Sequence, residues 1–251
     1  MDWLSEPFSH AFMQRAAVAG ILAAVTTSLV GTWVVLRGLT FMGDALAHGV
    51  LPGIALAVLW GFDPTVGAAA SAILMVLGIN VVHRYSRLNE DAGIGLLFVG
   101  MLALGVVIIS RTPSYTGSLT GILFGDALAV TTGDIALLAA TLVAVVVATA
   151  VFYRSFLVLS FNADKAEMLG LYPRVAHVVM LGLVTLAVVA SFRTVGSLLV
   201  FGLLVAPPAT ASLLVRRVPA MMAAGACLGL ASVAVGLLVS WYADNAASDT
   251  V

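Results

Sequence analysis

Long apolar runs separated by short polar stretches dominate this chain of 251 residues. A helix that crosses a bilayer needs about 20 consecutive, predominantly apolar residues. The pattern therefore predicts an all-α integral membrane protein: a polytopic bundle of about eight transmembrane helices, with residues 1–251 in a single transmembrane domain. The eight runs are 16–36, 44–60, 66–82, 92–110, 134–153, 175–190, 194–215 and 219–241.

The composition supports this prediction and narrows the function. Hydrophobic residues make up 62% of the chain and charged residues only 9%, whereas soluble domains are about half apolar and about a quarter charged. A net charge of −1 gives no electrostatic basis for binding nucleic acid. The single cysteine, Cys227, excludes an internal disulfide and a cysteine-based metal site.

One segment leaves the number of spans open. Residues 114–132 contain several Gly and Thr residues and Asp126, which argues against a full span. A short or re-entrant helix over 119–130 is the alternative, and if it crosses the membrane the chain has nine spans and a cytoplasmic N-terminus. We expect eight spans, with both termini outside.

Basic residues set this orientation, because cytoplasmic loops carry an excess of Lys and Arg. With eight spans, Arg15, Arg111 and Arg193 lie outside. The larger basic set lies in the cytoplasm: Arg37, Arg84, Arg87, Arg154, Lys165, Arg174, Arg216 and Arg217.

The stretch 37–53, between the first two runs, carries the main candidate site. Asp44 and His48 are four residues apart, so a helix presents both on one face. An ionisable pair beside a membrane span is costly and indicates a function. Carboxylate with imidazole suits Zn²⁺ and tolerates Mn²⁺, but two ligands are too few, so the hypothesis includes a two-fold partner. Alternatively, Asp44 caps the second helix from a loop and His48 is a packing residue.

Proline residues mark two further positions. Proline has no N–H, so Pro52 deprives the carbonyl of His48 of its helical partner. Pro207 and Pro208 do the same to two carbonyls of the seventh run and predict an interruption there. Transporters often place their pathways at broken helices, although a merely structural kink is the alternative at Pro207 and Pro208.

The connector between the fifth and sixth runs predicts a short cytoplasmic helix over residues 162–170. Asn162 can cap its start and Gly170 its end. Its charged residues, together with exposed apolar ones, suit a surface that faces a partner, although an ordinary solvated loop helix is the alternative. The charged residues are Asp164, Lys165 and Glu167.

With these residues in view, the chain resembles the membrane permease subunit of zinc/manganese-type metal-ion ABC importers along nearly its whole length. Three blocks carry the resemblance: Gly43-Asp44-Ala-Leu-Ala-His48 with Leu51-Pro52-Gly53; the connector 164–170; and Val195-Gly196 with Leu203-Leu204-Val-Ala-Pro207 and Ala209-Thr-Ala211. The second proline, Pro208, departs slightly from the family pattern.

The resemblance implies a plasma-membrane permease of a prokaryote that moves Zn²⁺ or Mn²⁺ and holds no permanent cofactor. It implies three partners: a second permease copy in a homodimer or pair, a cytoplasmic ATPase that docks on the connector, and an extracellular metal-binding protein. Its metal-site positions carry over to Asp44 and His48. The chain has no Walker-type motif, so we expect ATP hydrolysis in a separate subunit and no enzymatic activity here.

Two other function classes compete with the importer. A self-contained, gradient-driven ion carrier or channel would work without partners and would leave the connector helix without a purpose. An intramembrane zinc protease would need His-Glu-x-x-His on a span, and the sequence has no such motif.

Overall fold

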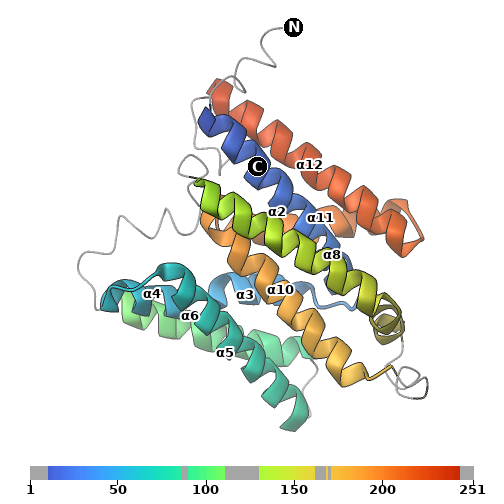
Figure 1. Ribbon diagram of the computed structural model, residues 1–251. Helices are drawn as coiled ribbons and strands as arrows, with labels where there is room; N and C mark the ends of the chain where they lie inside the picture. The colour runs from blue at the N-terminus through green and yellow to red at the C-terminus, as the bar shows by residue number, and fades with distance from the viewer. Residues whose placement is uncertain (1–10, 86–89, 111–129, 162–167, 169–170, 244–251) are drawn as a thin grey trace, which may run out of the picture.

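The computed structural model describes residues 11–85, 90–110, 130–161, 168 and 171–243, and all regular secondary structure in this part is helical (Figure 1). The prediction of an all-α fold is therefore confirmed. The helices are α2 (Ala11–Leu36), α3 (Thr40–Gly49), α4 (Leu51–Trp60), α5 (Pro64–Tyr85), α6 (Glu90–Ser110), α8 (Thr132–Phe161), α10 (Pro173–Val195), α11 (Ser197–Leu214) and α12 (Val218–Ala243).

Each predicted span corresponds to helical structure. Seven stretches in the described residues are long and apolar enough to cross a membrane, with α3 and α4 forming one of them. The shorter apolar helix Leu199–Leu214, within α11, corresponds to the remaining predicted span. Residues 119–129, on which the nine-span alternative depends, lie outside the described residues.

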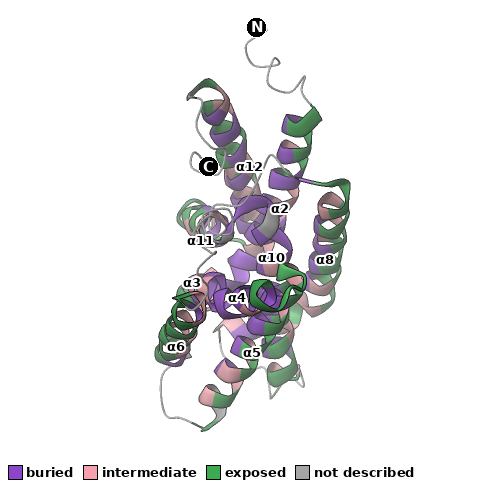
Figure 2. Cartoon of the chain, turned by 90° about the vertical axis from the view of Figure 1, so that its left-hand side faces the viewer, coloured by how far each residue is buried: buried purple, intermediate pink, exposed green. Residues whose placement is uncertain are grey.

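Helix α2 is at the centre of one group of helices and packs against α8, α10, α11 and α12 (Figure 1). A second group contains α3, α4, α5 and α6. Helix α10 joins the two groups through its contacts with α5 and α3, and α11 joins them through its contacts with α3. Figure 2 shows the consequence: buried residues gather along α2, α10 and α4, while α5, α6 and α8 turn exposed faces outward.

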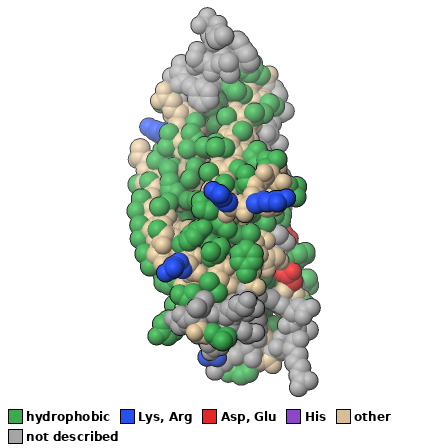
Figure 3. All heavy atoms as spheres, turned by 90° about the vertical axis from the view of Figure 1, so that its right-hand side faces the viewer, with side chains coloured by type: hydrophobic (Ala, Val, Ile, Leu, Met, Phe, Trp, Pro, Cys, Tyr) green, Lys and Arg blue, Asp and Glu red, His purple; other side chains and the backbone are tan. Residues whose placement is uncertain are grey.

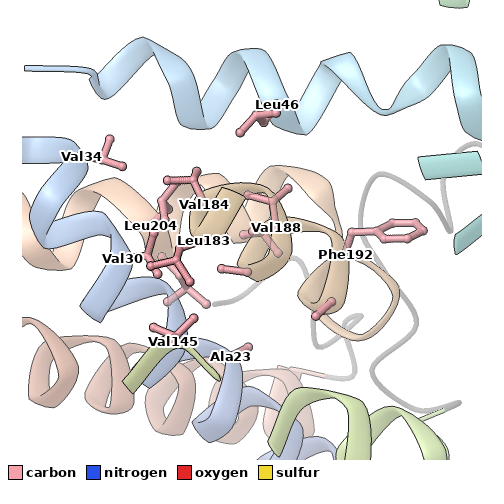
Figure 4. Packing of buried hydrophobic residues seen from close by; sticks show 14 of the residues in the cluster. Ala23, Val30, Val34, Leu46, Val145, Leu183, Val184, Val188, Phe192 and Leu204 are labelled. Carbon is pink, nitrogen blue, oxygen red and sulfur yellow. The ribbon is translucent and has the colours of Figure 1, made fainter. Parts of the chain in front are cut away.

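Branched aliphatic side chains from all of the described helices fill the interior. Figure 4 shows Val30 and Val34 of α2 close to Leu204 of α11 and Val184 of α10. Between α2 and α8, the buried indole of Trp33 meets the ring of Phe156 edge to face, with 5.4 Å between ring centroids. Such interdigitation holds helices together in lipid, where the hydrophobic effect between helices is absent.

The outer surface is also apolar. Large hydrophobic side chains on α5, α6, α8 and α12 are exposed, and Figure 3 shows hydrophobic side chains over most of one face with few charged ones among them. A water-soluble monomer rarely exposes so much apolar surface. This surface therefore suits contact with lipid.

The helices differ from the predicted spans mainly at their ends. The predicted fifth span ended at residue 153, but α8 continues to Phe161. Arg154 remains exposed, while Phe156 and Leu159 are buried, so the apolar face extends past the arginine. From sequence, this piece was predicted to belong to the connector because Arg154 interrupts the apolar run.

Candidate metal site

Helix α3 carries both candidate ligands. The predicted second span began at Asp44, but α3 begins at Thr40 and places Asp44 inside the helix. The residue preceding α3 is Leu39, and no side chain caps the helix there. The alternative in which Asp44 caps the second helix from a loop is therefore wrong. Asp44 and His48 lie one turn apart on the same helix.

The two side chains are directed toward one another. Nε2 of His48 lies 3.5 Å from Oδ1 of Asp44. The side chains of His48 and Asp44 keep 20% and 28% of their surface exposed, so both remain reachable from outside the subunit. A tetrahedral metal ion with bonds of ~2.1 Å holds its ligand atoms ~3.4 Å apart. The observed separation therefore allows both atoms to bind one ion.

Aromatic packing holds the imidazole ring of His48. The ring meets Phe98 of α6 edge to face, with 5.6 Å between centroids. Phe98 also contacts Phe41, which lies one turn before Asp44 and is half exposed. Nδ1 of His48 is buried and has no hydrogen-bond partner among the described residues. The direction of the ring is therefore set by packing and by the backbone of α3.

No third ligand completes the site within the described part of this subunit. Groups of three or more His, Cys, Asp or Glu side chains suited to a metal ion are absent from it. A structural zinc site uses four protein ligands, and a catalytic zinc site uses three. Within the described part of the subunit, the site brings together two candidate protein ligands, Asp44 and His48.

The helix is interrupted at Val50, two residues after His48. Helix α3 ends at Gly49, Val50 forms the junction, and α4 begins at Leu51 with Pro52 as its second residue. The hydroxyl of Ser71, on α5, donates a hydrogen bond of 2.7 Å to the carbonyl oxygen of Gly49. Ser71 is not among the site residues predicted from sequence, where its signal is a single hydroxyl within a largely apolar run.

Pro207 and Pro208 do not interrupt their helix. The sequence predicted a break there, but α11 runs from Ser197 to Leu214 with both prolines inside it. The break in this region lies earlier, at Gly196, where a φ of 84° separates α10 from α11. Both prolines are buried. They face neighbouring helices and do not create an opening in α11.

A second contact that the sequence did not reveal joins the end of α2 to the start of α10. Nη1 of Arg37 donates a hydrogen bond of 2.6 Å to Nδ1 of the buried His177. A guanidinium group has only donors, so Nδ1 must accept. The contact fixes the turn that leads into α3 against α10.

The comparison with protein families decides the class. The family model described as the ABC 3 transport family matches residues 9–251. The chain belongs to this family. It is a permease of the ABC transporter type and a multi-pass protein of the plasma membrane, in agreement with the resemblance noted from sequence.

Relatives match this ABC 3 chain along almost its full length. It is 37% identical over 248 residues to the manganese transport system membrane protein MntC of Listeria innocua, which covers 99% of this chain and 88% of the relative. It is 35% identical over 244 residues to a probable iron transport system membrane protein of Haemophilus influenzae, covering 97% and 89%.

Solved structures show the same fold. PsaBC from Streptococcus pneumoniae, in complex with Fab, matches with a TM-score of 0.85 and 29% identity, covering 99% of this chain and 90% of that one. An inward-facing metal-chelate type ABC transporter matches with a TM-score of 0.75. At 14% identity, this second match concerns the fold alone.

The candidate residues for docking an ATPase subunit belong to the connector, residues 162–170. Asp164, Lys165, Glu167 and Gly170 lie outside the described residues. Within the connector, the structure describes Met168, whose side chain is 87% exposed.

Proposed function

We propose that this chain is the permease subunit of an ABC importer for a divalent transition-metal ion, Mn²⁺ or Zn²⁺, which passes between Asp44 and His48. The observation that carries the proposal is this pair, an acid and an imidazole 3.5 Å apart on a helix of a membrane bundle. Relatives named for manganese and iron transport support a first-row metal as cargo and favour Mn²⁺ over Zn²⁺.

A second permease copy completes the site. Two copies related by a two-fold axis supply two carboxylates and two imidazoles, which is enough for a tetrahedral ion or, with waters, for a larger shell. The two negative charges neutralise a divalent ion and offset part of the cost of holding it at low dielectric. Partial exposure of both side chains, beside the half-exposed Phe41, supports an open face for that contact.

The remaining partners follow from the class of transporter. A cytoplasmic ATPase subunit supplies the energy and docks on the connector, where Asp164, Lys165, Glu167 and Gly170 form the contact. An extracellular metal-binding protein delivers the ion. Residues 1–251 act as one transmembrane domain, surrounded by membrane lipid.

Removing either candidate ligand, the carboxylate of Asp44 or the imidazole of His48, tests this function. In cells that carry the complete transporter, Asp44→Asn and His48→Ala should each lower uptake of radioactive Mn²⁺ at limiting external metal by at least about tenfold, since each removes a direct ligand. Membrane content of the protein and its co-purification with the ATPase should stay unchanged.

Asp63→Asn is the matched control. Asp63 accepts a hydrogen bond of 2.7 Å from the backbone N–H of Thr65 at the start of α5 and lies on an exposed turn. The substitution removes the same charge from a residue away from the site, so uptake should be normal. Normal Mn²⁺ accumulation in both Asp44→Asn and His48→Ala would contradict the proposed site.

A further inference from the structure

The hydroxyl of Ser71 behaves differently from most hydroxyls in these helices. Serine and threonine in a helix usually bond back to a carbonyl three or four residues earlier, as Thr185 does to Leu181. Ser71 instead donates across to another helix, and its side chain is buried with 7% exposure. The carbonyl that it reaches belongs to Gly49, the residue directly after His48.

This carbonyl lies where the helix hydrogen bonding is disturbed. Pro52 has no N–H for the carbonyl of His48, and a proline ring forces the carbonyl four residues earlier to move aside. Helix α3 accordingly ends at Gly49. A backbone N–H at the end of α3 bonds to the carbonyl of His48. The carbonyl of Gly49, the last residue of α3, must also be satisfied inside the protein in a membrane bundle. Ser71 satisfies it and fixes its direction.

Close backbone contact holds the same two segments together independently of Ser71. A Cβ atom added to Gly53 would lie 2.0 Å from the carbonyl oxygen of Gly67, and one added to Gly67 would lie 2.3 Å from that of Gly53. A Cβ atom added to Gly49 would lie 2.2 Å from the sulfur of Met75. We call these contacts, in which Gly49 and Gly53 meet Gly67, Ser71 and Met75, the glycine seam.

Because of the glycine seam, the association of α4 with α5 and the direction of the Gly49 peptide group depend on different contacts. Because Gly53 and Gly67 bring the backbones of α4 and α5 together, the helices stay associated when the hydroxyl of Ser71 is removed. What the hydroxyl adds is the direction of the Gly49 peptide group. That peptide group follows His48, whose ring has packing but no hydrogen bond to Nδ1 among the described residues.

We propose that Ser71 is a positioning residue for the metal site: through the carbonyl of Gly49 it holds the helix break in the geometry that directs His48 toward Asp44. Its role rests on the metal-import function proposed above. Ser71 touches neither ligand, so it acts on how well the ion is held and leaves the number of ligands unchanged. Groups that orient metal ligands commonly change affinity by about 10–100-fold.

Three variants of the complete transporter in proteoliposomes test this role, with Mn²⁺ as the probe. Ser71→Ala should raise the Mn²⁺ concentration that gives half-maximal uptake by about tenfold, the lower end of that range. Its ATP hydrolysis without Mn²⁺ and its thermal stability should stay close to those of the parent protein. Ser71→Thr keeps a hydroxyl on the same carbon, so it should restore half-maximal uptake to within about twofold of the parent.

Ser28→Ala is the matched control. The hydroxyl of Ser28 also crosses between helices, donating to the carbonyl of Gly225 at 3.2 Å, but it joins α2 to α12 and lies on other helices than the metal site. This variant should leave half-maximal uptake unchanged. If Ser71→Ala and Ser28→Ala give the same half-maximal concentration, Ser71 has no positioning role. If Asp44→Asn also transports normally, the proposed metal site itself fails, and if the parent protein moves no Mn²⁺, the import function fails, so these failures are distinguishable from loss of the Ser71 role alone.

Discussion

The break at Pro52 and the intact helix at Pro207 and Pro208 show two outcomes of the same residue type. Each proline removes an N–H and releases a carbonyl four residues earlier. At Pro52 the helix divides into α3 and α4. In α11 two consecutive prolines leave the helix continuous. The sequence alone would rank the double proline as the stronger breaker, and it is the weaker one.

The neighbouring helices explain this difference. The carbonyl oxygen of Leu204, which Pro208 releases, lies against Gly31 of α2, 1.8 Å from where a Cβ atom would be. A Cα–H group at such close approach offers weak compensation for the missing N–H. Pro208 also packs beside Gly225 of α12. Helix α11 is thus held between two glycines, whereas beside Pro52 the hydroxyl of Ser71 bonds to the carbonyl of Gly49, one residue after the carbonyl that Pro52 releases.

Gly31→Ala should destabilise the protein more than any other substitution considered, because it disrupts the contact that supports α11. The new methyl group would overlap the backbone carbonyl of Leu204, which cannot move without displacing α11. We expect a loss of about 3 kcal/mol or more in stability, at the upper end for overpacking. Thermal unfolding in detergent measures it. Gly202→Ala in α11, where no atom lies within 4 Å of the new methyl group, should unfold like the parent, and equal unfolding of the two variants would contradict the close contact.

Gly67→Ala should have the next largest effect on stability. Gly67 lies on α5, against Gly53 of α4, the helix that contains Pro52. The new methyl group would lie 2.3 Å from the carbonyl oxygen of Gly53 and would push α4 from α5. We expect a loss of about 2 kcal/mol in stability together with strongly reduced Mn²⁺ uptake. Gly95→Ala, at an open position on α6, should preserve both. Normal uptake by Gly67→Ala would show that the glycine seam does not support the site.

Pro52→Ala and Pro207→Ala should differ from each other in uptake while changing stability little. Alanine at position 52 supplies the missing N–H and allows α3 and α4 to join, so uptake should fall while thermal stability is kept or increased. Pro207→Ala leaves an already continuous α11, so uptake should change little. Uptake and melting temperature of each variant decide it, and equal loss of uptake in both would contradict the distinction.

Periodicity and length were sufficient to predict the architecture. Each apolar run became helical, the second as the two helices α3 and α4, because in lipid the backbone must satisfy its own hydrogen bonds. The placement of Asp44 and His48 on one face also followed from their spacing. What spacing could not show was the start of α3 at Thr40, because no capping side chain marks it.

Contacts between helices could not be predicted from the sequence. The role of Ser71 depends on which carbonyl lies opposite it, and the continuity of α11 depends on Gly31, nearly two hundred residues away in the chain. The contact of Arg37 with His177 likewise joins distant residues. Local propensity carries no information on such pairs. They are fixed only when the helices pack.

The central place of α2 has a consequence for how the protein is made. Of the described helices α2 is translated first, yet its neighbours α8, α10, α11 and α12 all follow later. Thr27 and Thr32 donate to carbonyls of α2 itself, so these hydroxyls are already satisfied before any partner arrives. Ser28 instead donates to Gly225 of α12. The hydroxyl of Ser28 in α2 can therefore reach this partner only after α12, the last of the described helices, has been synthesised.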